Sequence, residues 1–149
     1  MKTTRLALAF AALAASTLAS AADGLIALKS PHPAAATMDR FEAAAKARGL
    51  NIFARIDHAA GAAKVGKTLR PTQVLIFGNP QGGTPFMECA QSVGIDLPLK
   101  ALAWEDAQGQ SWIGYNDPAW LAKRHGTDCP VAAGLAKALA GLAEASIAK

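Results

Sequence analysis

A histidine that follows an acidic residue is the first candidate for chemistry in this chain. His58 comes directly after Asp57, and a neutral imidazole at that place can act as a general base, a metal ligand or a hydrogen-bond donor. The pair also has a structural use, in which Asp57 caps a short helix and His58 packs over the end of a strand. Both interpretations stay open from the sequence.

A glycine-rich segment over residues 78–85 is the second candidate. It follows an apolar run, Val74 to Phe77, and is rich in the glycine, asparagine and proline residues that favour tight turns. Thr84 and Pro85 are typical of the start of a helix. We therefore expect a buried strand, a loop over residues 79–84, and then a helix.

Such a loop can bind an anion through its backbone N–H groups, helped by the helix dipole. Asn79, Gly82 and Gly83 are then the residues expected to contact the ligand. The segment lacks the spacing of a Walker loop and that of a dinucleotide-binding loop. A simple turn is the alternative, and we expect no cofactor.

Lys100 is the third candidate, since it follows Leu97-Pro98-Leu99 in an otherwise apolar strand. It is expected either to bind an acidic ligand or pair with Asp57, or to face outward and protect a sheet edge. His32, His58 and His125 form no metal-binding motif. A copper or haem site built from His58 and Met87 is a weaker alternative.

Two cysteines, Cys89 and Cys129, complete the set of reactive side chains. In an oxidising compartment an even, low count favours one disulfide. The alternative is a pair of reduced thiols that serve a metal or a redox step, although no C-x-x-C spacing supports it.

The N-terminus is typical of a secretory leader. Lys2 and Arg5 precede an apolar stretch over residues 6–15, and small residues at 19–22 suit a signal peptidase. We expect cleavage after residue 21 or 22, export to the periplasm or beyond, and one domain over residues 23–149. Loss of the leader leaves 13 basic and 11 acidic residues, a balance too mild to suggest nucleic acid, and no later stretch is apolar enough to span a membrane. We therefore expect neither nucleic acid nor, once the leader is cleaved, a membrane as partner.

The remaining pattern predicts an α+β domain in the order β-α-β-α-β-α-β-β-α-α. The expected strands are 24–29, 50–56, 72–77, 97–105 and 110–115, and the expected helices are 34–48, 58–65, 85–93, 118–125 and 130–147. A hairpin around residues 106–109 must be antiparallel, so we expect a mixed five-stranded sheet with helices mainly on one face. Trp104, Trp112, Tyr115 and Trp120 are expected in the core, at a dimer interface, or as an aromatic wall for a ligand.

Four separated motifs resemble one family. They are Arg55 to Ala60, Leu75 to Pro80, Asp96 to Lys100 and Trp112 to Tyr115, and together they are similar to the domain of unknown function 302 family. The resemblance implies a compact α+β domain, often a homodimer, with no established reaction. It places the family's signature positions at His58, Gly78, Asn79, Pro80, Leu97, Pro98 and Lys100.

These features together predict an exported small-ligand-binding or accessory protein, for which an anion is a candidate ligand. We expect the Asp57-His58 turn and the 79–84 loop to meet at one end of the sheet, provided that the strands before them run parallel. An enzyme that uses His58 as acid and base, and a periplasmic metal- or haem-binding protein, are the alternatives.

Overall fold

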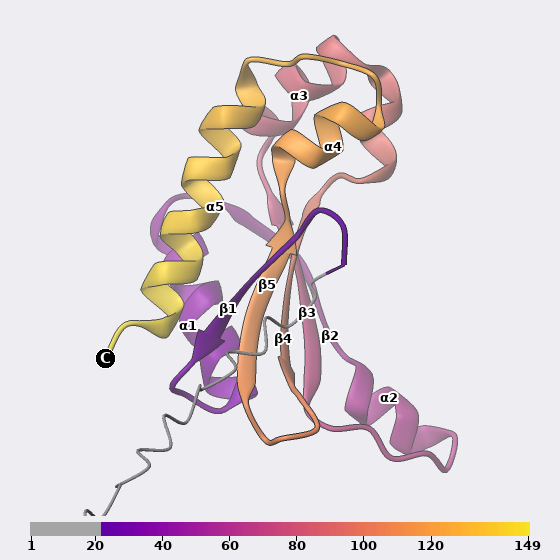
Figure 1. Ribbon diagram of the computed structural model, residues 1–149, viewed down its shortest axis with the longest axis vertical. Helices are drawn as coiled ribbons and strands as arrows, with labels where there is room; N and C mark the ends of the chain where they lie inside the picture. Colours follow the sequence, from indigo (N-terminus) through magenta and orange to yellow (C-terminus); the bar gives the residue numbers. More distant parts are fainter. Residues whose placement is uncertain (1–21) are drawn as a thin grey trace, which may run out of the picture.

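Five strands form one sheet in the order β1-β5-β4-β3-β2, and every neighbouring pair is antiparallel (Figure 1). The structure is a computed structural model that describes residues 22–149, so the predicted leader lies almost wholly outside the described residues. The strands are β1 (Leu25–Ser30), β2 (Asn51–Asp57), β3 (Thr72–Gly78), β4 (Leu99–Glu105) and β5 (Ser111–Asn116). The helices are α1 (Ala34–Ala47), α2 (His58–Lys64), α3 (Pro80–Cys89), the 3₁₀ helix η1 (Gln91–Ile95), α4 (Pro118–Arg124) and α5 (Val131–Ile147).

The α+β class, the five strands and the order of the elements are confirmed, but the sheet is not mixed. A parallel partner for β2 would need a connection that carries the chain back along the whole sheet. Residues 58–71 instead run outward through the short helix α2 and return beside the end of β2, where Asp57 pairs with Gln73. The strand β3 therefore runs back along β2, and Gly78 ends opposite Asn51.

The main core lies between one face of the sheet and the helices α1 and α5. Met38, Phe41 and Ala45 recur at helical spacing on α1 and are fully buried. Phe41 meets Phe77 of β3 edge to face, with ring centroids 5.2 Å apart. Alternation along each strand then directs every second residue to the opposite face of the sheet.

That opposite face carries no packed helix among the described residues. We call it the open face, and its central apolar residues are Ile56, Val74, Ile76, Leu102 and Trp104, which the strand register places side by side. All five are partly exposed, whereas Leu75, Phe77 and Ala101 on the covered face are fully buried.

The four aromatic residues singled out in the sequence lie in different places. Trp104 and Trp112 stack on the open face, with ring centroids 6.1 Å apart and planes 12° apart. Tyr115 points the other way into the main core and is 4% exposed. Trp120 closes over Gly24, where the ring leaves no room for any side chain.

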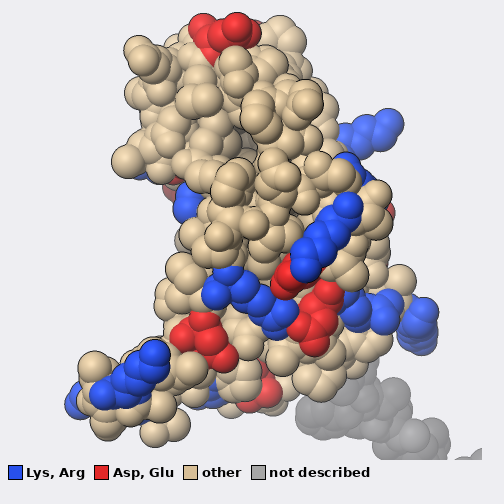
Figure 2. Space-filling model, turned by 180° about the vertical axis from the view of Figure 1, so that it is seen from behind, with Lys and Arg blue, Asp and Glu red and all other residues tan. Residues whose placement is uncertain are grey.

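Ion pairs link β2 to α1 on the lower part of the covered face. Arg55 of β2 reaches Asp39 and Glu42 of α1, with its Nη1 atom 2.6 Å and 3.2 Å from their carboxylate oxygens. Hydrogen bonds from Lys46 and Arg55 lower the pKa of Glu42 against the opposing effect of burial. Figure 2 shows acidic and basic side chains interleaved over the lower part of this view, and few charges on the upper part, where Figure 1 places α3.

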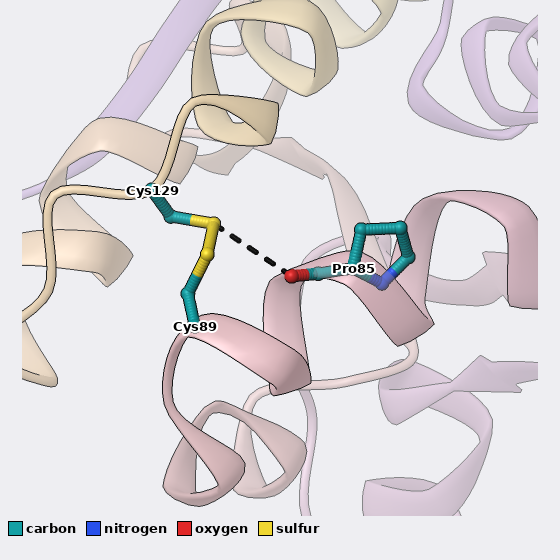
Figure 3. The surroundings of a disulfide bond; sticks show 3 residues. All are labelled: Pro85, Cys89 and Cys129. Atoms are coloured by element: carbon teal, nitrogen blue, oxygen red, sulfur yellow. Dashed lines mark hydrogen bonds between the residues drawn. A yellow bond between two sulfur atoms is a disulfide. The ribbon is translucent and has the colours of Figure 1, made fainter.

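A second apolar cluster lies beyond the upper end of the sheet. It joins α3, η1, α4 and the start of α5 through Phe86, Val93, Leu121, Cys129 and Ala132. The predicted disulfide between Cys89 and Cys129 is present at its edge and joins the end of α3 to the segment before α5 (Figure 3). The Cα atoms are 5.8 Å apart, within the ordinary range for a disulfide. No helix among residues 22–149 is long and apolar enough to cross a membrane.

Removal of the disulfide is expected to destabilise the domain. The bond links residues 40 positions apart. Its loss in a C89S/C129S variant raises the conformational entropy of the unfolded chain, which lowers the free energy of unfolding by about 4 kcal/mol in the loop-closure model. Urea unfolding of the variant and of wild type, each with and without reductant, measures the difference. We expect reductant to lower the wild-type midpoint and to leave the variant unchanged; equal midpoints for oxidised and reduced wild type would show that the bond adds no stability.

Candidate ligand-binding cavity

A cavity of about 450 Å³ opens where the main core meets the second apolar cluster. The start of β2, the end of β3 and the start of β4 form its floor, and α3 and α5 form its walls. Most of its surface is apolar, from Leu50, Phe53, Phe77, Pro80, Met87, Leu97, Pro98, Leu99, Leu135, Ala138, Leu139 and Leu142. The other lining residues are Gly78, Asn79, Gly82, Gly83, Thr84 and Gly94, so no described lining residue carries a charge.

The predicted loop over residues 79–84 is helical instead, and forms the first turns of α3. Asn79, not Thr84, is the N-cap, and Pro80, not Pro85, is the first helical residue. The side chain of Asn79 accepts a hydrogen bond of 2.9 Å from the N–H of Gly82, in the usual manner of a capping asparagine. Pro80 suits the first helical position because the backbone nitrogen there donates no hydrogen bond within the helix.

This capping changes what the glycine segment offers to a ligand. The N–H groups of Gly82 and Gly83 both donate to the main-chain oxygen of Asn79, at 3.3 and 3.1 Å, and the Gly82 N–H also bonds the Asn79 side chain. They are therefore satisfied within the helix and are not free to hold an anion. The amide nitrogen Nδ2 of Asn79 and the hydroxyl of Thr84 have no hydrogen-bond partner among the described residues, so they are the polar side-chain groups that this wall offers.

The two glycines contribute space as well. A Cβ atom on Gly82 would stand 3.2 Å from Leu135 Cδ2, and one on Gly83 would stand 3.6 Å from Leu97 Cδ1. Larger side chains at these positions would extend into the cavity from α3.

His58 lies at the other end of the sheet and lines no part of the cavity. It is the first residue of α2 and is exposed. Asp57 before it acts as the predicted N-cap, and the hydrogen bond from the Ala60 N–H is the main cause of a lowered Asp57 pKa. The expectation that His58 and Asn79 meet on one edge is therefore wrong, because β2 and β3 are antiparallel. The same geometry separates His58 from Met87, so these two residues do not form a metal site.

Lys100 is near the cavity in sequence but points away from it. Leu99 faces the cavity, and alternation along β4 turns the next side chain to the open face. The Nζ atom of Lys100 donates to the carbonyl oxygens of Asp96 and Pro98, each at 3.1 Å. It thus supports the turn before β4 and makes no pair with Asp57.

A chain of polar contacts that the sequence did not suggest connects η1 to α4. Ser92 Oγ lies 2.9 Å from His125 Nδ1, and His125 Nε2 lies 2.7 Å from Asp96 Oδ2. The residue types are those of a hydrolase triad. However, Arg124 binds the second oxygen of Asp96 at 2.8 Å, and neither Ser92 nor His125 lines the cavity. These polar contacts hold η1 against the end of α4. Within residues 22–149, no three His, Cys, Asp or Glu side chains are grouped closely enough to hold a metal ion.

This chain is similar to known proteins in sequence, in three-dimensional structure and in its match to a family model. Three Brucella proteins are each 52% identical over 102 residues, or 68% of this chain: fluoride-specific ion channel FluC 1 of Brucella suis biovar 1 (strain 1330), FluC 1 of Brucella abortus biovar 1 (strain 9-941) and FluC 2 of Brucella melitensis biotype 1 (strain ATCC 23456). The match covers 40% of the first protein and 38% of the other two, so this chain spans about two fifths of their length.

The crystal structure of an uncharacterized conserved DUF302 protein from Bacillus stearothermophilus shares the fold. The TM-score is 0.75 at 22% sequence identity, over 84% of this chain and 99% of that one. The model of the domain of unknown function DUF302 matches residues 26–145, which is most of the sequence. The chain therefore belongs to the DUF302 family.

Proposed function

We propose that this protein binds a small, uncharged and mainly apolar molecule in the cavity between α3 and α5. The observation that carries the proposal is the cavity itself: its volume of about 450 Å³ lies in the range of natural ligand sites, and its described lining is free of charge. An anionic ligand, which the sequence suggested, finds neither a charged side chain nor free glycine N–H groups there. Burial of apolar ligand surface supplies most of the affinity.

The polar groups of the cavity limit the ligand further. Asn79 Nδ2 and the Thr84 hydroxyl suit a ligand with one or two hydrogen-bond acceptors, such as carbonyl or ether oxygens. Phe53, which is 57% exposed, stands at the rim where β2 has a bulge. A flat or chain-like molecule with one or two acceptors fits this arrangement.

Export remains part of the proposal. The leader predicted over residues 1–22 and the Cys89–Cys129 disulfide both support a periplasmic or secreted protein, because structural disulfides persist in oxidising compartments. The alternative of an enzyme based on His58 has less support, since that residue is exposed and lies away from the cavity.

Blocking the cavity is expected to weaken binding. The probe is N-phenyl-1-naphthylamine, a neutral aromatic molecule that fluoresces in apolar surroundings. In a G83L variant the new side chain extends into the cavity and displaces apolar contacts, which weakens binding by about tenfold or more. Fluorescence titration measures the affinity of the probe, and thermal melting confirms that each variant is folded.

The matched control is G134L, on the exposed surface of α5, where an added Cβ meets nothing within 4 Å. It should bind like wild type. Equal affinity for G83L and G134L would remove the cavity as the site, and competition by inorganic phosphate would restore the anionic ligand. Mass spectrometry of a solvent extract of undialysed protein then identifies the natural ligand.

The open face supports a homodimer. Its central residues Ile56, Val74, Ile76, Leu102 and Trp104 form an apolar surface, with Lys100 beside Ile76, and exposed apolar surfaces often mark an interface. A second copy related by a two-fold axis presents the same surface and covers it.

A charge at the centre of the open face should therefore separate the dimer. Leu102 pairs with Val74 and Gly114, so a L102K variant buries a lysine in the proposed interface, and its mass by light scattering should be half that of wild type. A133K, on the exposed side of α5, is the control and should keep the wild-type mass. A monomeric wild-type protein, or an unchanged mass for L102K, would contradict this interface.

An accessory role beside a membrane channel is the second candidate function. It rests on the 52% identity to part of three much longer proteins named fluoride-specific ion channels. Deletion of the gene in its native host should then raise sensitivity to fluoride, and the gene supplied in trans should restore growth. Equal growth of deletion and parent strains across fluoride concentrations would dismiss this role.

A further inference from the structure

The segment between β2 and β3 projects from the end of the sheet opposite the cavity. This arm, residues 58–71, consists of α2 and the chain that returns to β3 (Figure 1). None of the residues of α2 is buried. Val65 and Leu69 are 73% and 53% exposed, and they are two of the six large apolar side chains that the described residues leave exposed.

The arm is nevertheless well defined in shape. Its root is fixed because Asp57 accepts hydrogen bonds from the Ala60 N–H and from the Gln73 side chain. Its turn is fixed because Gly66 adopts a left-handed conformation, with φ of 70°, and the Lys67 N–H bonds the Ala62 carbonyl at 3.0 Å. An ordered segment loses little entropy when it docks on a partner.

The charge of the arm has one sign. Lys64, Lys67 and Arg70 are all exposed, and residues 58–71 contain no acidic side chain. Seen from behind, the arm carries basic side chains and no acidic ones on the visible face (Figure 2). Lys64 and Lys67 flank Val65 in sequence, so an apolar side chain and two cations are presented together at the turn of the arm. Arg70 lies at the root of the arm, where its charge acts on the carboxyl group of Asp106.

We infer that the arm is a contact site for an anionic lipid surface. The apolar side chains enter the interfacial layer while the cations bind lipid headgroups, as in other peripheral contacts of mixed basic and apolar character. This contact needs no spanning helix, and it departs from the sequence-based expectation of no membrane partner, which considered spanning segments and overall charge.

A second copy of the chain is a poorer occupant. The only charged residues that the described strands direct to the open face are Lys29 and Lys100. A basic arm laid on that face would meet charges of its own sign, whereas an anionic bilayer offers the opposite sign. Docking on lipid should be reversible, rise with the fraction of anionic lipid and weaken with added salt.

Flotation of purified protein with lipid vesicles tests the inference. One set of vesicles is pure phosphatidylcholine and the other contains equal parts of phosphatidylcholine and phosphatidylglycerol. An intact-mass measurement first establishes that the preparation lacks the leader, which would bind lipid by itself. We expect wild type to float with the anionic vesicles at low salt and to stay behind with the neutral ones.

Two arm variants and one control locate the contact. K64E/K67E should lower the bound fraction by about tenfold or more, and V65S/L69S should lower it while leaving the net charge unchanged. K123E/K137E makes the same change in net charge on α4 and α5, and it should bind like wild type. Binding as weak as that of K64E/K67E would show that the overall charge, and not the arm, is responsible. That result, equal flotation with neutral vesicles, or conversion of a dimer to a monomer by the arm variants, would overturn the inference. Binding of the apolar probe to the cavity should stay unchanged in all three variants, so this test is separate from that of the proposed function.

Discussion

The antiparallel pairing of β2 with β3 is the constraint on which the arrangement of the molecule depends. The register from Asn51↔Gly78 to Asp57↔Gln73 sets the end of one strand beside the start of the other. The chain therefore leaves β2 at one end of the sheet, through α2, and leaves β3 at the opposite end, through α3. A slip of one residue would exchange the two faces of a strand and expose Leu75 and Phe77, which are fully buried, so the main core itself enforces the register.

The cavity follows from how two apolar clusters share one helix. The first half of α5 packs on the second cluster through Ala132 and Leu135, and the second half packs on the sheet through Leu139 and Leu142. Side chains of both clusters line the space between them. Glycines on α3 keep that space open, and the disulfide and the Asp96–Arg124 pair hold the second cluster in place beside it. The site is thus a seam between two packed bodies, which is a common location for ligand pockets.

The sequence revealed the elements far better than their directions. Periodic apolar residues and capping signals located all five strands and the five α-helices of the described residues, but not the 3₁₀ helix η1. An even cysteine count in a chain with a predicted leader indicated the disulfide. The direction of β3 could not be read in the same way, because alternating strands and helices usually mean parallel strands. Residues 58–65 have the pattern of a helix whether β3 runs parallel or antiparallel to β2. Their sequence does not show whether the helix crosses the sheet or leads outward and back.

The start of α3 was ambiguous for another reason. Asn79-Pro80 and Thr84-Pro85 carry the same capping signal five residues apart, and a helix that begins at the first pair must accept Pro85 inside it. Packing decides in favour of the first, since the earlier start places Gly82 and Gly83 against Leu135 and Leu97. The orientation of Lys100, in contrast, was accessible from the sequence: with Leu99 and Ala101 directed inward, alternation already turns the lysine outward.

The separation of the two ends has a consequence for how the proposed activities fit together. The seven residues of β2 span roughly 20 Å, so a lipid surface held by the arm stays about that far from the cavity. A ligand would then not pass directly from the bilayer into the cavity, but would enter from water or from another protein at the upper end. Phe53 and Asn79 line the cavity at that end. A donor of the ligand would therefore approach the upper part of the molecule, which carries few charges in the view of Figure 2, and such a donor is expected to present an apolar surface of its own.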